Sequence, residues 1–470
     1  MRRTKIVATI GPASRDPVIL QKLIEAGVNV VRMNFSHGEH ADHLQVMLAV
    51  RDIAERTGRS IALLQDLSGP KIRTGRVKDD AVELRDGATL AITIDESVEG
   101  TSELISTTYD PLPRDVNPGD RILLDDGNLE LKVVRAEGER VLTEVVHGGI
   151  LKSNKGMNLP GVRLSTPALT EKDRRDLAFG VEHRVDYVAL SFVRQAKDVE
   201  ETKALIRALG GTMPVIAKIE KREAIDDLPQ ILEAADGVMV ARGDLGVELS
   251  TEEVPTLQKR IIEMANGAGK VVITATQMLE SMIEHARPTR AEASDVANAM
   301  LDGTDAIMLS AETASGRFPL ESVETMSRIA GYTEEHYGFR SPARVGGAAS
   351  SMVARSLARV AATVAEELDC KLILAFTESG ATARLVSSYR PRARIVAITY
   401  NDETFRRLSL WWGVVPVKSA FAKTTDEMIL KGEALLKQLG MVHPGDTIVM
   451  LGGQSHTAGA TNMLRVHAIS

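Results

Sequence analysis

The 470-residue sequence contains a single cysteine, Cys370, few aromatic residues and no long apolar run. One cysteine cannot form an intrachain disulfide or supply a thiolate metal cluster, which favours a reducing compartment. A signal peptide needs roughly 7–15 consecutive apolar residues and a membrane span roughly 20, and the sequence shows neither pattern. We therefore expect a cytoplasmic protein that does not associate with a membrane.

Positive charge is not in excess either. Lys and Arg number 57 against 64 Asp and Glu, and aromatic residues make up 3% of the chain. Proteins that bind nucleic acid through its phosphates carry basic surfaces, so this composition argues against nucleic acid as a partner. Hydrophobic residues make up 44%, which is enough for buried cores and excludes general disorder. The length predicts two or three domains.

Short β-branched segments alternate with longer amphipathic segments over most of residues 4–332. Eight short segments are predicted strands: Lys5–Ile10, Val28–Met33, Ile61–Gln65, Tyr187–Leu190, Val215–Ile219, Gly237–Val240, Val271–Ala275 and Ala306–Leu309. Strand–helix alternation predicts parallel strands joined by crossover helices, and eight units predict a (β/α)8 TIM barrel of the α/β class. The alternative is an open doubly wound sheet, but no Gly-x-Gly-x-x-Gly turn follows the first strand.

The third unit is interrupted by a segment of different composition, residues 71–166. Its short alternating runs are Ala88–Ile94, Arg121–Leu124, Leu129–Val134 and Val141–Val146, separated by Gly, Asp, Asn and Pro. This pattern is typical of a small β domain, here expected as a β-barrel. Because the insertion follows the third strand, it would lie over the carboxyl ends of the barrel strands, where such barrels build their active sites. We predict that it forms a lid.

A third domain follows Arg340–Ser351, a segment whose Ser, Gly, Ala and Pro content predicts a linker. Strands are predicted beyond it at Leu372–Phe376, Ile395–Thr399, Val414–Val417, Thr447–Leu451 and Asn462–His467, mostly alternating with helices. The predicted organisation is a barrel domain at 1–70 and 167–340, a lid at 71–166 and an α/β regulatory domain at 346–470.

Polar residues and one glycine follow most of the predicted barrel strands. They are Arg32, Asn34, Ser36, Asp66, Lys218, Glu220, Arg242, Gly243, Asp244, Thr276, Ser310 and Glu312. In a barrel of parallel strands these ends converge on one face. Any one of these residues is explained equally well as part of a solvated loop, but the set as a whole favours a binding site.

Lys218 and Glu220 are two residues apart on one predicted strand, so their side chains point to the same side. One explanation is a salt bridge that closes the mouth of the barrel. Asp244, after the next strand, brings a second carboxylate near Glu220, and Mg²⁺ prefers one or two carboxylates with substrate oxygens and water. We favour the metal interpretation, in which Lys218 faces a metal-bound anion and Gly243 allows close backbone approach.

His37, His40 and His43 have a spacing that resembles a metal cluster. The spacing spreads them around a helix and no acidic or thiol partner is clearly placed, so we expect a solvated helix start instead. The chain also lacks a Gly-x-x-x-x-Gly-Lys-[Ser/Thr] loop and a His-Arg-Asp signature, which excludes a P-loop enzyme and a protein-kinase fold.

Seven sequence motifs resemble those of the pyruvate kinase family. They are RMNFSHG (Arg32–Gly38), DLSGPKIRTG (Asp66–Gly75), AKIEKREA (Ala217–Ala224), ARGDLGVE (Ala241–Glu248), ATQMLESM (Ala275–Met282), RPTRAEASDVANA (Arg287–Ala299) and DAIMLSAETASGRFP (Asp305–Pro319). The likeness runs through all three predicted domains in the family's order. It implies a glycolytic phosphotransferase that converts phosphoenolpyruvate and ADP to pyruvate and ATP.

Two other functions would account for part of this pattern. A barrel lyase or aldolase that uses Mg²⁺ and an enolpyruvate substrate would need the Glu220–Asp244 pair but no nucleotide lid. The insert with Arg73 and Lys155 therefore argues against it. A non-catalytic metabolite sensor would not need an intact Lys218.

The resemblance also assigns roles to residues. It implies Glu220 and Asp244 as ligands of Mg²⁺, with Mn²⁺ as a substitute, and Lys218 as the group that stabilises the phosphoryl group in flight. The other assignments are Arg32 for the substrate phosphate, Gly243, Asp244 and Thr276 for the substrate carboxylate, and Asn34, Phe35, Ser36, His37, Arg73 and Lys155 for the nucleotide. Separately from the resemblance, Thr276 and Ser310 with Glu312 would suit a water-linked proton relay to the enolate, but the sequence does not identify the acid. Metal ions, Lys218, Arg32 and Arg73 would offset the repulsion between two polyanions.

Many members of the family hold K⁺ near the substrate, through residues matching Asn34, Ser36, Asp66 and the carbonyl of Leu67. Where those enzymes typically read Asp-Thr-Lys-Gly-Pro-Glu, this chain reads DLSGPK, ending at Lys71. The ammonium of Lys71 would occupy the K⁺ site and present the same single charge; the alternative is that Lys71 points to solvent at the lid hinge and K⁺ binds as usual. We therefore predict that K⁺ is not required.

The C-terminal domain contains a loop that resembles the family's effector site. Strand Leu372–Phe376 runs into a helix start made of Thr377, Glu378, Ser379, Gly380, Ala381 and Thr382, which favours an anion, although a plain capped helix is the alternative. Neither this loop nor Gly452–Gly459 contains Lys or Arg. We therefore expect activation by AMP or a sugar monophosphate rather than a bisphosphate. The resemblance further implies a homotetramer.

Overall fold

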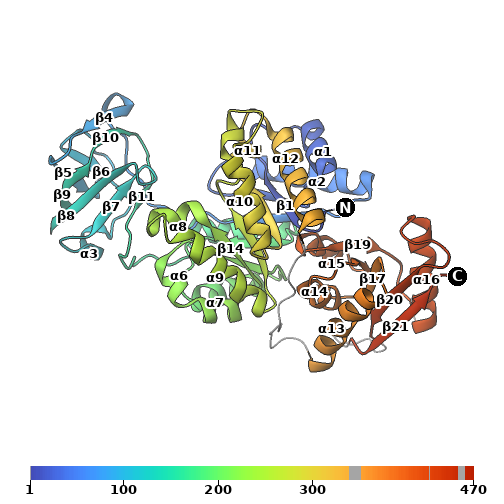
Figure 1. The fold of residues 1–470 in the computed structure, drawn as a ribbon. Coiled ribbons are helices and arrows are strands. Elements are labelled where there is room, and N and C mark those ends of the chain that lie inside the picture. Colours follow the sequence, from blue (N-terminus) through green and yellow to red (C-terminus); the bar gives the residue numbers. More distant parts are fainter. Residues whose placement is uncertain (1, 338–350, 423, 454–460) are drawn as a thin grey trace.

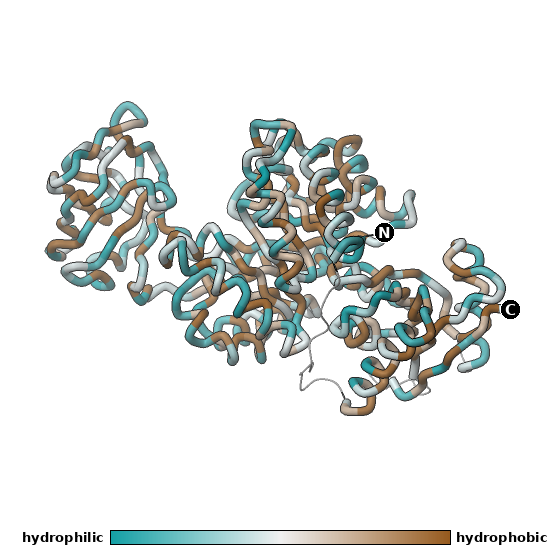
Figure 2. The backbone as a smooth tube through the Cα atoms, viewed as in Figure 1, coloured by the Kyte–Doolittle hydropathy of each residue, from teal (hydrophilic) through white to brown (hydrophobic). Residues whose placement is uncertain are grey.

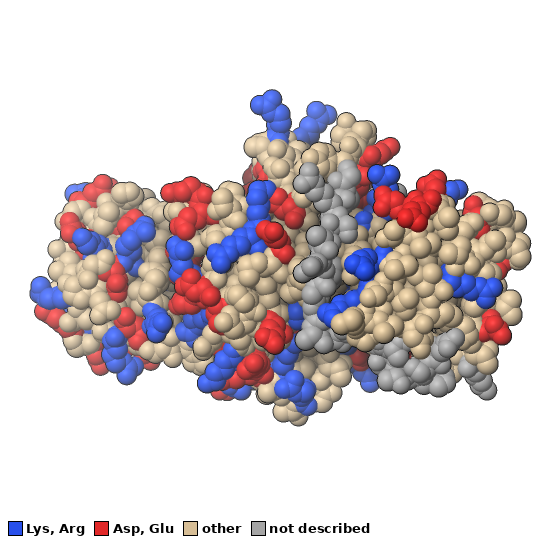
Figure 3. Space-filling model, turned by 60° about the horizontal axis from the view of Figure 1, so that its bottom comes forward, with Lys and Arg blue, Asp and Glu red and all other residues tan. Residues whose placement is uncertain are grey.

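The computed structural model describes residues 2–337, 351–422, 424–453 and 461–470, and its three parts are drawn in Figure 1. A barrel lies at the centre, a β-rich lobe extends from one side, and an α/β lobe packs against the other. Within the described ranges, no helix combines the length and the apolar composition needed to cross a membrane. Basic and acidic side chains are interspersed over the face shown in Figure 3.

The central part is a closed barrel of eight parallel strands. In sheet order they are β1 (Lys5–Thr9), β16 (Ala306–Leu309), β15 (Val271–Ala275), β14 (Gly237–Ala241), β13 (Val215–Ile219), β12 (Tyr187–Leu190), β3 (Ala62–Asp66) and β2 (Val30–Asn34). The predicted barrel is confirmed, and each strand lies within two residues of its predicted bounds. These strands are almost entirely buried, which explains their near-continuous apolar runs.

Helices cover the outside of the barrel. They are α1 (Pro17–Ala26), α2 (His40–Thr57), α4 (Glu171–Glu182), α5 (Ala196–Ala208), α6 (Arg222–Asp226), α7 (Leu228–Ala234), α8 (Arg242–Glu248), α9 (Val254–Gly267), η2 (Glu280–Ile283), α10 (Arg290–Leu301), α11 (Ala311–Ala314) and α12 (Pro319–His336). Several begin at capping residues: Thr170 and Asp173 form a capping box on α4, and Thr289 and Glu292 form one on α10. Their apolar faces join the outer faces of the strands in one buried cluster.

The β-rich lobe interrupts the chain between β3 and α4. Its elements are η1 (Lys78–Asp80), β4 (Ala81–Leu84), β5 (Thr89–Thr93), β6 (Leu104–Ser106), α3 (Leu112–Asp115), β7 (Arg121–Leu124), β8 (Leu129–Glu137), β9 (Arg140–His147), β10 (Gly149–Lys152) and β11 (Met157–Asn158). They enclose a separate apolar core, and Figure 2 shows apolar segments running along the strands. The larger sheet has the order β11-β7-β8-β9-β5-β6, and isolated bridges of Arg73 with Gly156 and of Thr74 with Thr107 link its two ends, as a β-barrel requires; β10 and β4 form a separate two-stranded sheet. Register shifts in the β8–β9 pair interrupt the regular ladder of the larger sheet.

The α/β lobe is built on a five-stranded sheet in the order β19 (Val414–Lys418), β18 (Arg394–Thr399), β17 (Leu372–Phe376), β20 (Thr447–Gly452) and β21 (Met463–Ala468). Its helices are α13 (Met352–Glu367), α14 (Ala381–Ser388), α15 (Asp402–Arg407), η3 (Leu408–Leu410) and α16 (Thr425–Gln438). The five predicted strands are confirmed, and β21 runs antiparallel to β20. All but the last residue of the predicted linker lie outside the described residues.

The α/β lobe packs against the amino ends of the barrel strands. The Lys5 ammonium, at the start of β1, donates to the Val414 carbonyl at 2.6 Å, and the Tyr187 hydroxyl, at the start of β12, donates to the Arg407 carbonyl at 2.6 Å. Apolar residues of the barrel interior and of this lobe belong to one buried cluster. One end of the barrel is therefore covered by protein, and a site built on it belongs at the carboxyl ends of the strands.

Candidate active site

Lys218 lies near the carboxyl end of β13, surrounded by oxygen atoms from three strand ends. Its ammonium donates to the Ser191 hydroxyl at 2.7 Å and lies 3.4 Å from a Glu220 carboxylate oxygen and 3.5 Å from Asp66 Oδ1. Burial opposes the charge on Lys218, but the carboxylates of Asp66 and Glu220 outweigh burial and raise the pKa of the ammonium. The site therefore holds a permanent positive charge at the barrel mouth.

Glu220 and Asp244 face this cation from different elements. Glu220 is 2% exposed and its Oε1 accepts a hydrogen bond from the Phe192 amide at 2.5 Å. Burial raises the pKa of Glu220, Lys218 opposes the rise and Asp244 adds to it. Asp244, in the first turn of α8, is exposed and makes no hydrogen bond or ion pair within the described part of the chain. Its carboxylate is thus available to a ligand.

These two carboxylates fit a magnesium ion better than a transition metal. Within the described ranges no group of three or more His, Cys, Asp and Glu residues is arranged to hold a metal. Mg²⁺ needs only one or two protein carboxylates because it keeps water and substrate oxygens as its other ligands. A buried carboxylate beside an unpartnered exposed one meets that need.

Arg32 and Asp66 extend the charged cluster along the barrel mouth. The Arg32 guanidinium lies 2.6 Å from Asp66 Oδ2 and donates to the Thr9 hydroxyl at 2.9 Å. Burial alone would raise the pKa of Asp66, but Lys218 and Arg32 together lower it. Asp66 is therefore an ionised carboxylate shared between two cations, and it orients both of them.

Gly243 and Thr276 come together between β14 and β15. The Gly243 amide donates to the Thr276 hydroxyl at 2.7 Å, and that hydroxyl donates in turn to the Ala275 carbonyl at 2.7 Å. Thr276 has a φ of 70°, which is unusual for a β-branched residue. The strained backbone at this strand end is of the kind that collects at functional sites.

Ser310 and Glu312 lie at the end of β16. The Glu312 carboxylate is 2% exposed and accepts from the Ser310 amide at 2.7 Å and from the Leu279 amide at 3.1 Å. Burial raises the pKa of Glu312. Among the described residues, the buried Ser310 hydroxyl has no hydrogen-bond partner. Within the same residues, no hydrogen bond joins Ser310 or the Glu312 carboxylate to the Thr276 hydroxyl.

The segment after β2 was predicted to bind the nucleotide, and its side chains point in different directions. Asn34 Oδ1 accepts from the Ser36 amide at 3.1 Å, and His37 is exposed. Burial lowers the pKa of His37, and the nearby cations Lys71 and Arg73 lower it further. The Phe35 ring is 1% exposed in the barrel core, so only its backbone remains for a ligand.

Arg73 and Lys155 are close neighbours in the β-rich lobe. Arg73 pairs through its backbone with Gly156, and its guanidinium donates to the Asn154 carbonyl at 2.9 Å. The Lys155 ammonium lies 2.7 Å from Asp125 Oδ1. The two residues therefore lie on paired backbone segments of the lobe, and the Lys155 ammonium is paired with a carboxylate of the lobe itself.

Two residues of the predicted K⁺ pocket, Asn34 and Asp66, pair across strands β2 and β3, and Leu67 follows directly. The Leu67 carbonyl accepts from the Ser191 hydroxyl at 2.7 Å, while the Leu67 side chain is buried in the core. The Lys71 residue is exposed. Partial burial of its ammonium and the charge of Lys218 lower the pKa of Lys71, while the carboxylates of Asp244 and Asp66 act in the opposite direction. The Lys71 ammonium is therefore within electrostatic range of the charged cluster.

Comparisons with known proteins identify the family. Residues 1–323 match the model of the pyruvate kinase barrel domain, and residues 355–467 match that of the pyruvate kinase alpha/beta domain. The chain belongs to the pyruvate kinase family.

Its relatives cover the full chain. Pyruvate kinase of Geobacillus stearothermophilus is 47% identical over 476 residues, which span 100% of this chain and 81% of the relative. The enzyme of Staphylococcus aureus (strain USA300) is 45% identical with the same coverage. The crystal structure of a pyruvate kinase from Cryptosporidium parvum matches with a TM-score of 0.93 at 36% identity, covering 100% of this chain and 96% of the other. The resemblance seen in the motifs is confirmed, and neither a barrel lyase nor a metabolite sensor is favoured.

The loop that resembles the pyruvate kinase effector site begins at Thr377, after β17. The Thr404 hydroxyl donates to the Glu378 carbonyl at 2.6 Å, and Thr382 shares a 2.6 Å hydrogen bond with Thr461. Arg384 lies over the Trp411 ring, 5.6 Å from its centroid. Most of the second predicted loop, Gly452–Gly459, lies outside the described residues.

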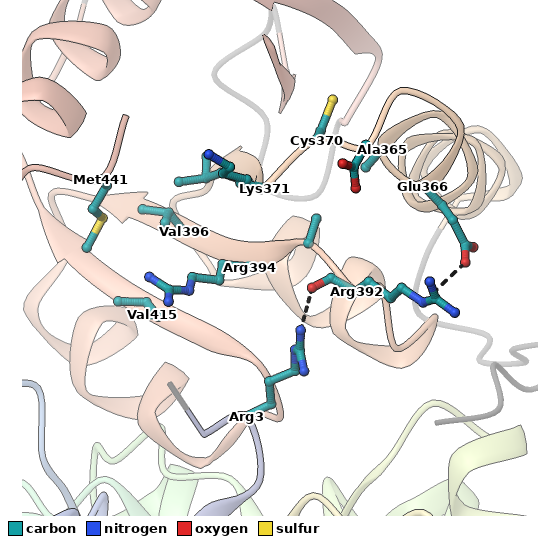
Figure 4. Close-up of a pocket in the computed structure, with 13 residues that line it drawn as sticks. Arg3, Ala365, Glu366, Cys370, Lys371, Arg392, Arg394, Val396, Val415 and Met441 are labelled. Atoms are coloured by element: carbon teal, nitrogen blue, oxygen red, sulfur yellow. Dashed lines mark hydrogen bonds and ion pairs between the residues drawn. The ribbon is translucent and has the colours of Figure 1, made fainter. Parts of the chain in front are cut away.

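A pocket of about 390 Å³ lies at the opposite edge of the same sheet (Figure 4). Arg3, Arg392 and Arg394 surround it, near the amino ends of β17 and β18. The Arg3 guanidinium donates to the Arg392 carbonyl at 2.5 Å, and Arg392 pairs with Glu366 at 3.6 Å. The predicted effector residues follow the carboxyl end of β17 and do not line this pocket.

The prediction of a solvated helix start for the three histidines needs correction. His43 is 9% exposed and its ring stacks on Phe35 at 4.1 Å between centroids. His40 stacks on Phe179 at 4.3 Å and its Nε2 lies 2.7 Å from Asp176 Oδ1. A spacing of three places His40 and His43 on the same side of α2, which here packs against aromatic neighbours.

Sequence reasoning missed the residues after β12. Ser191 contacts Lys218, and the Phe192 amide contacts Glu220. Both residues directly follow the predicted strand Tyr187–Leu190. The rule that polar groups follow barrel strands, applied to this fourth strand, would have found Ser191.

Proposed function

We propose that this chain carries out the pyruvate kinase reaction, phosphoryl transfer from phosphoenolpyruvate to ADP, on the group formed by Lys218, Glu220 and Asp244. The observation that supports this is the Lys218 ammonium, which lies 3.4 Å from a Glu220 carboxylate oxygen and 3.5 Å from Asp66 Oδ1 at the carboxyl ends of the barrel strands. Two polyanions repel each other in water, and a cation already desolvated and oriented stabilises the transferring oxygens without further reorganisation. Lys218 is the residue suited to that task.

Mg²⁺, with Mn²⁺ as a substitute, would be held by Glu220 and Asp244. When bound, a divalent ion neutralises negative charge on the substrate oxygens. Glu220 is kept in place by the Phe192 amide, and Asp244 by its position in the first turn of α8. Arg32, held by Asp66, would contact the phosphate of phosphoenolpyruvate.

The substrate carboxylate would lie against Gly243, Asp244 and Thr276. The Gly243 amide at present donates to the Thr276 hydroxyl, so a bound carboxylate would replace that hydroxyl as its acceptor. Thr276 would donate to the substrate by turning its hydrogen away from the Ala275 carbonyl. Phosphoryl transfer leaves an enolate that needs a proton at carbon. We assign Thr276, Ser310 and Glu312 to a water-linked relay, since the raised pKa of Glu312 suits a proton carrier.

The β-rich lobe, residues 71–166, would act as the lid between the barrel segments 1–70 and 167–340. Arg73 and Lys155 would contact the nucleotide phosphates together with Asn34, Ser36, His37 and the backbone of Phe35. The cations around His37 support this, because they concentrate positive charge beside the lid. Closure would exclude water that competes for the phosphoryl group.

The test of this assignment is a coupled assay for pyruvate from phosphoenolpyruvate and ADP, with and without Mg²⁺. We expect Lys218→Met to remain folded and to bind Mn²⁺, but to lose transition-state stabilisation on the order of several kcal/mol. Lys5→Met is the matched control, because it removes a buried lysine from the other end of the barrel and should leave turnover intact. A folded Lys218→Met enzyme with near-normal turnover would overturn the assignment.

Lys71 would replace the K⁺ ion that other pyruvate kinases hold near Asn34, Ser36, Asp66 and the Leu67 carbonyl. Its ammonium feels both Asp66 and Asp244, which supports a place beside the substrate phosphate. We expect near-full activity with tetramethylammonium as the only monovalent cation. Lys71→Glu should lower that activity and potassium should partly restore it.

The control for Lys71 is Lys78→Glu, which makes the same charge change at an exposed residue of the lobe and should leave activity and its salt response unchanged. A wild-type enzyme that is inactive until potassium is added would refute the substitution of K⁺ by Lys71.

The α/β lobe, residues 346–470, would regulate the enzyme through the loop Thr377–Thr382. The described part of this loop contains no cation, and Arg384 is turned to Trp411, so two phosphates would be poorly neutralised. We expect AMP or a sugar monophosphate to increase substrate affinity more than fructose 1,6-bisphosphate. Selective activation by the bisphosphate in parallel titrations would exclude a monophosphate effector site at this loop.

We also assign a homotetramer in the cytoplasm. The support is the family resemblance and the single cysteine, which is buried and suits a reducing compartment. Light scattering of the purified enzyme tests the assembly, since a tetramer of this 50.8 kDa chain has about four times its mass.

A further inference from the structure

The turn Ser191–Arg194 after β12 contacts Lys218, Glu220 and one connection of the β-rich lobe. Ser191 is 1% exposed, and its hydroxyl lies 2.7 Å from the Lys218 ammonium and 2.7 Å from the Leu67 carbonyl. An ammonium can only donate, so the serine oxygen accepts from Lys218 and its own hydrogen goes to Leu67. The hydroxyl therefore presents a fixed acceptor to Lys218.

The next residue of the turn orients the carboxylate beside Lys218. The Phe192 amide donates to Glu220 at 2.5 Å, and Phe192 adopts a φ of 56°, a left-handed conformation that aromatic residues rarely take. Its ring fills the space next to Gly69, where a Cβ would come within 2.5 Å of Phe192 Cδ2. A strained backbone conformation persists only where the surrounding contacts hold it in place, and here the conformation of Phe192 directs its amide toward Glu220.

The same turn holds the return connection of the β-rich lobe. The Arg194 guanidinium donates to the Leu164 carbonyl at 2.6 Å and to the Thr166 carbonyl at 2.8 Å. Gly69, under the Phe192 ring, belongs to the outgoing connection of that lobe. Both connections of the lobe thus meet one turn, which also holds Lys218 and Glu220.

We propose that Ser191 is a positioning residue that sets the Lys218 ammonium for phosphoryl transfer, and that Arg194 links the placement of the lobe to this geometry through the same turn. The inference rests on the proposed function of Lys218. It differs from that function because Ser191 and Arg194 need not touch the substrate.

The first experiment compares Ser191→Ala, Ser191→Thr and wild type. A hydrogen bond to a charged group is worth a factor of about 10 to 100, so Ser191→Ala should lower kcat by that factor while KM for phosphoenolpyruvate changes less than about threefold. Ser191→Thr keeps the hydroxyl and should retain kcat within about fivefold. Ser322→Ala is the matched control, because its buried hydroxyl donates to the Phe318 carbonyl at 2.7 Å and lies far from Lys218 in the chain.

The Ser322→Ala enzyme should show wild-type kcat whatever its melting temperature. A folded Ser191→Ala enzyme with kcat within twofold of wild type would overturn the positioning role. So would a threonine variant that is folded but as slow as the alanine variant. If the wild type itself forms no pyruvate, the proposed function fails, and this outcome is distinct from both.

The second experiment measures the link to the lobe. Arg194→Met should raise KM for ADP by about fivefold or more, since both carbonyl contacts that hold the lobe are lost, and should also lower kcat, since the turn that carries Ser191 loses those contacts. In the double variant Ser191→Ala/Arg194→Met, the effects on kcat should be less than additive, as expected for residues that act through one turn. Arg174→Met, at an exposed pair on α4, is the control and should leave both constants unchanged. Strict additivity in the double variant would refute the link.

Discussion

Lys5 lies inside the protein where the amino end of the barrel meets the α/β lobe. The residue is 6% exposed, and its ammonium donates to the Val414 carbonyl at 2.6 Å. Burial lowers the pKa of Lys5 to about 7, Arg2 adds to the fall and Glu334 opposes it. We consider the substitution Lys5→Met, which keeps an unbranched side chain and removes the titration.

The effect on stability depends on pH in a defined direction. In the unfolded chain Lys5 titrates at its ordinary value of 10.5. Between pH 7 and 10.5 the unfolded chain keeps a proton that the folded chain has released, so rising pH stabilises the fold across this window. Below pH 7 the folded protein bears the full cost of a buried charge. At about 1.4 kcal/mol per pKa unit, the window corresponds to roughly 5 kcal/mol.

The assay is urea unfolding of wild type and Lys5→Met at pH 6, 7.5 and 9. Both tryptophans of the chain, Trp411 and Trp412, are buried in the α/β lobe close to Val414 in the sequence, so tryptophan fluorescence reports on unfolding of this region. Circular dichroism reports on unfolding of the whole chain. We expect the methionine variant to be more stable at pH 6 and to lose about 2.5 kcal/mol of that advantage by pH 9.

The exposed Lys22, on α1, supplies the control. Lys22→Met should shift stability by the same small amount at every pH. If the stability curves of Lys5→Met and wild type run parallel from pH 6 to 9, then Lys5 does not titrate in this range in the folded protein and the reasoning is refuted.

Two further predictions concern packing. Gly69→Ala should lower the free energy of unfolding by about 2 to 4 kcal/mol and lower turnover, because the new Cβ would lie 2.5 Å from the Phe192 ring. Gly58→Ala is the control, since Gly58 has a similar φ of 64° but no neighbour within 4 Å. Thermal melts and kinetics of the two variants separate the steric contact from the backbone strain. Arg390→Met should destabilise the fold by about 3 to 5 kcal/mol, because it removes the guanidinium that lies 2.9 Å from the buried Asp305 carboxylate. In thermal melts the double variant Arg390→Met/Asp305→Asn should recover much of this loss. No recovery would contradict the pairing.

Much of the fold follows from local sequence patterns. Buried strands appear as short apolar runs, helix starts as capping residues and turns as Gly, Asp and Pro, so the eight barrel strands could be located to within two residues. The strand-end rule also brought Lys218, Glu220 and Asp66 to one place, because parallel strands must end on the same side. The four short strands β4, β6, β10 and β11 were missed, since runs of two to four residues carry little periodicity.

Other features depend on contacts between residues far apart in the chain, and no local pattern encodes those. The acceptor for Lys218 is a serine 27 residues earlier, and the partner of Lys5 is a carbonyl 409 residues later. Whether Phe35 and His43 face solvent or each other depends on how α2 and α4 pack over the barrel, because the same residues would suit an exposed helix start. Sequence alone thus determined which side chains gather at the barrel mouth; the tertiary structure decided which atoms restrain them, since a hydrogen bond selects its partner by position in space and not by spacing along the chain.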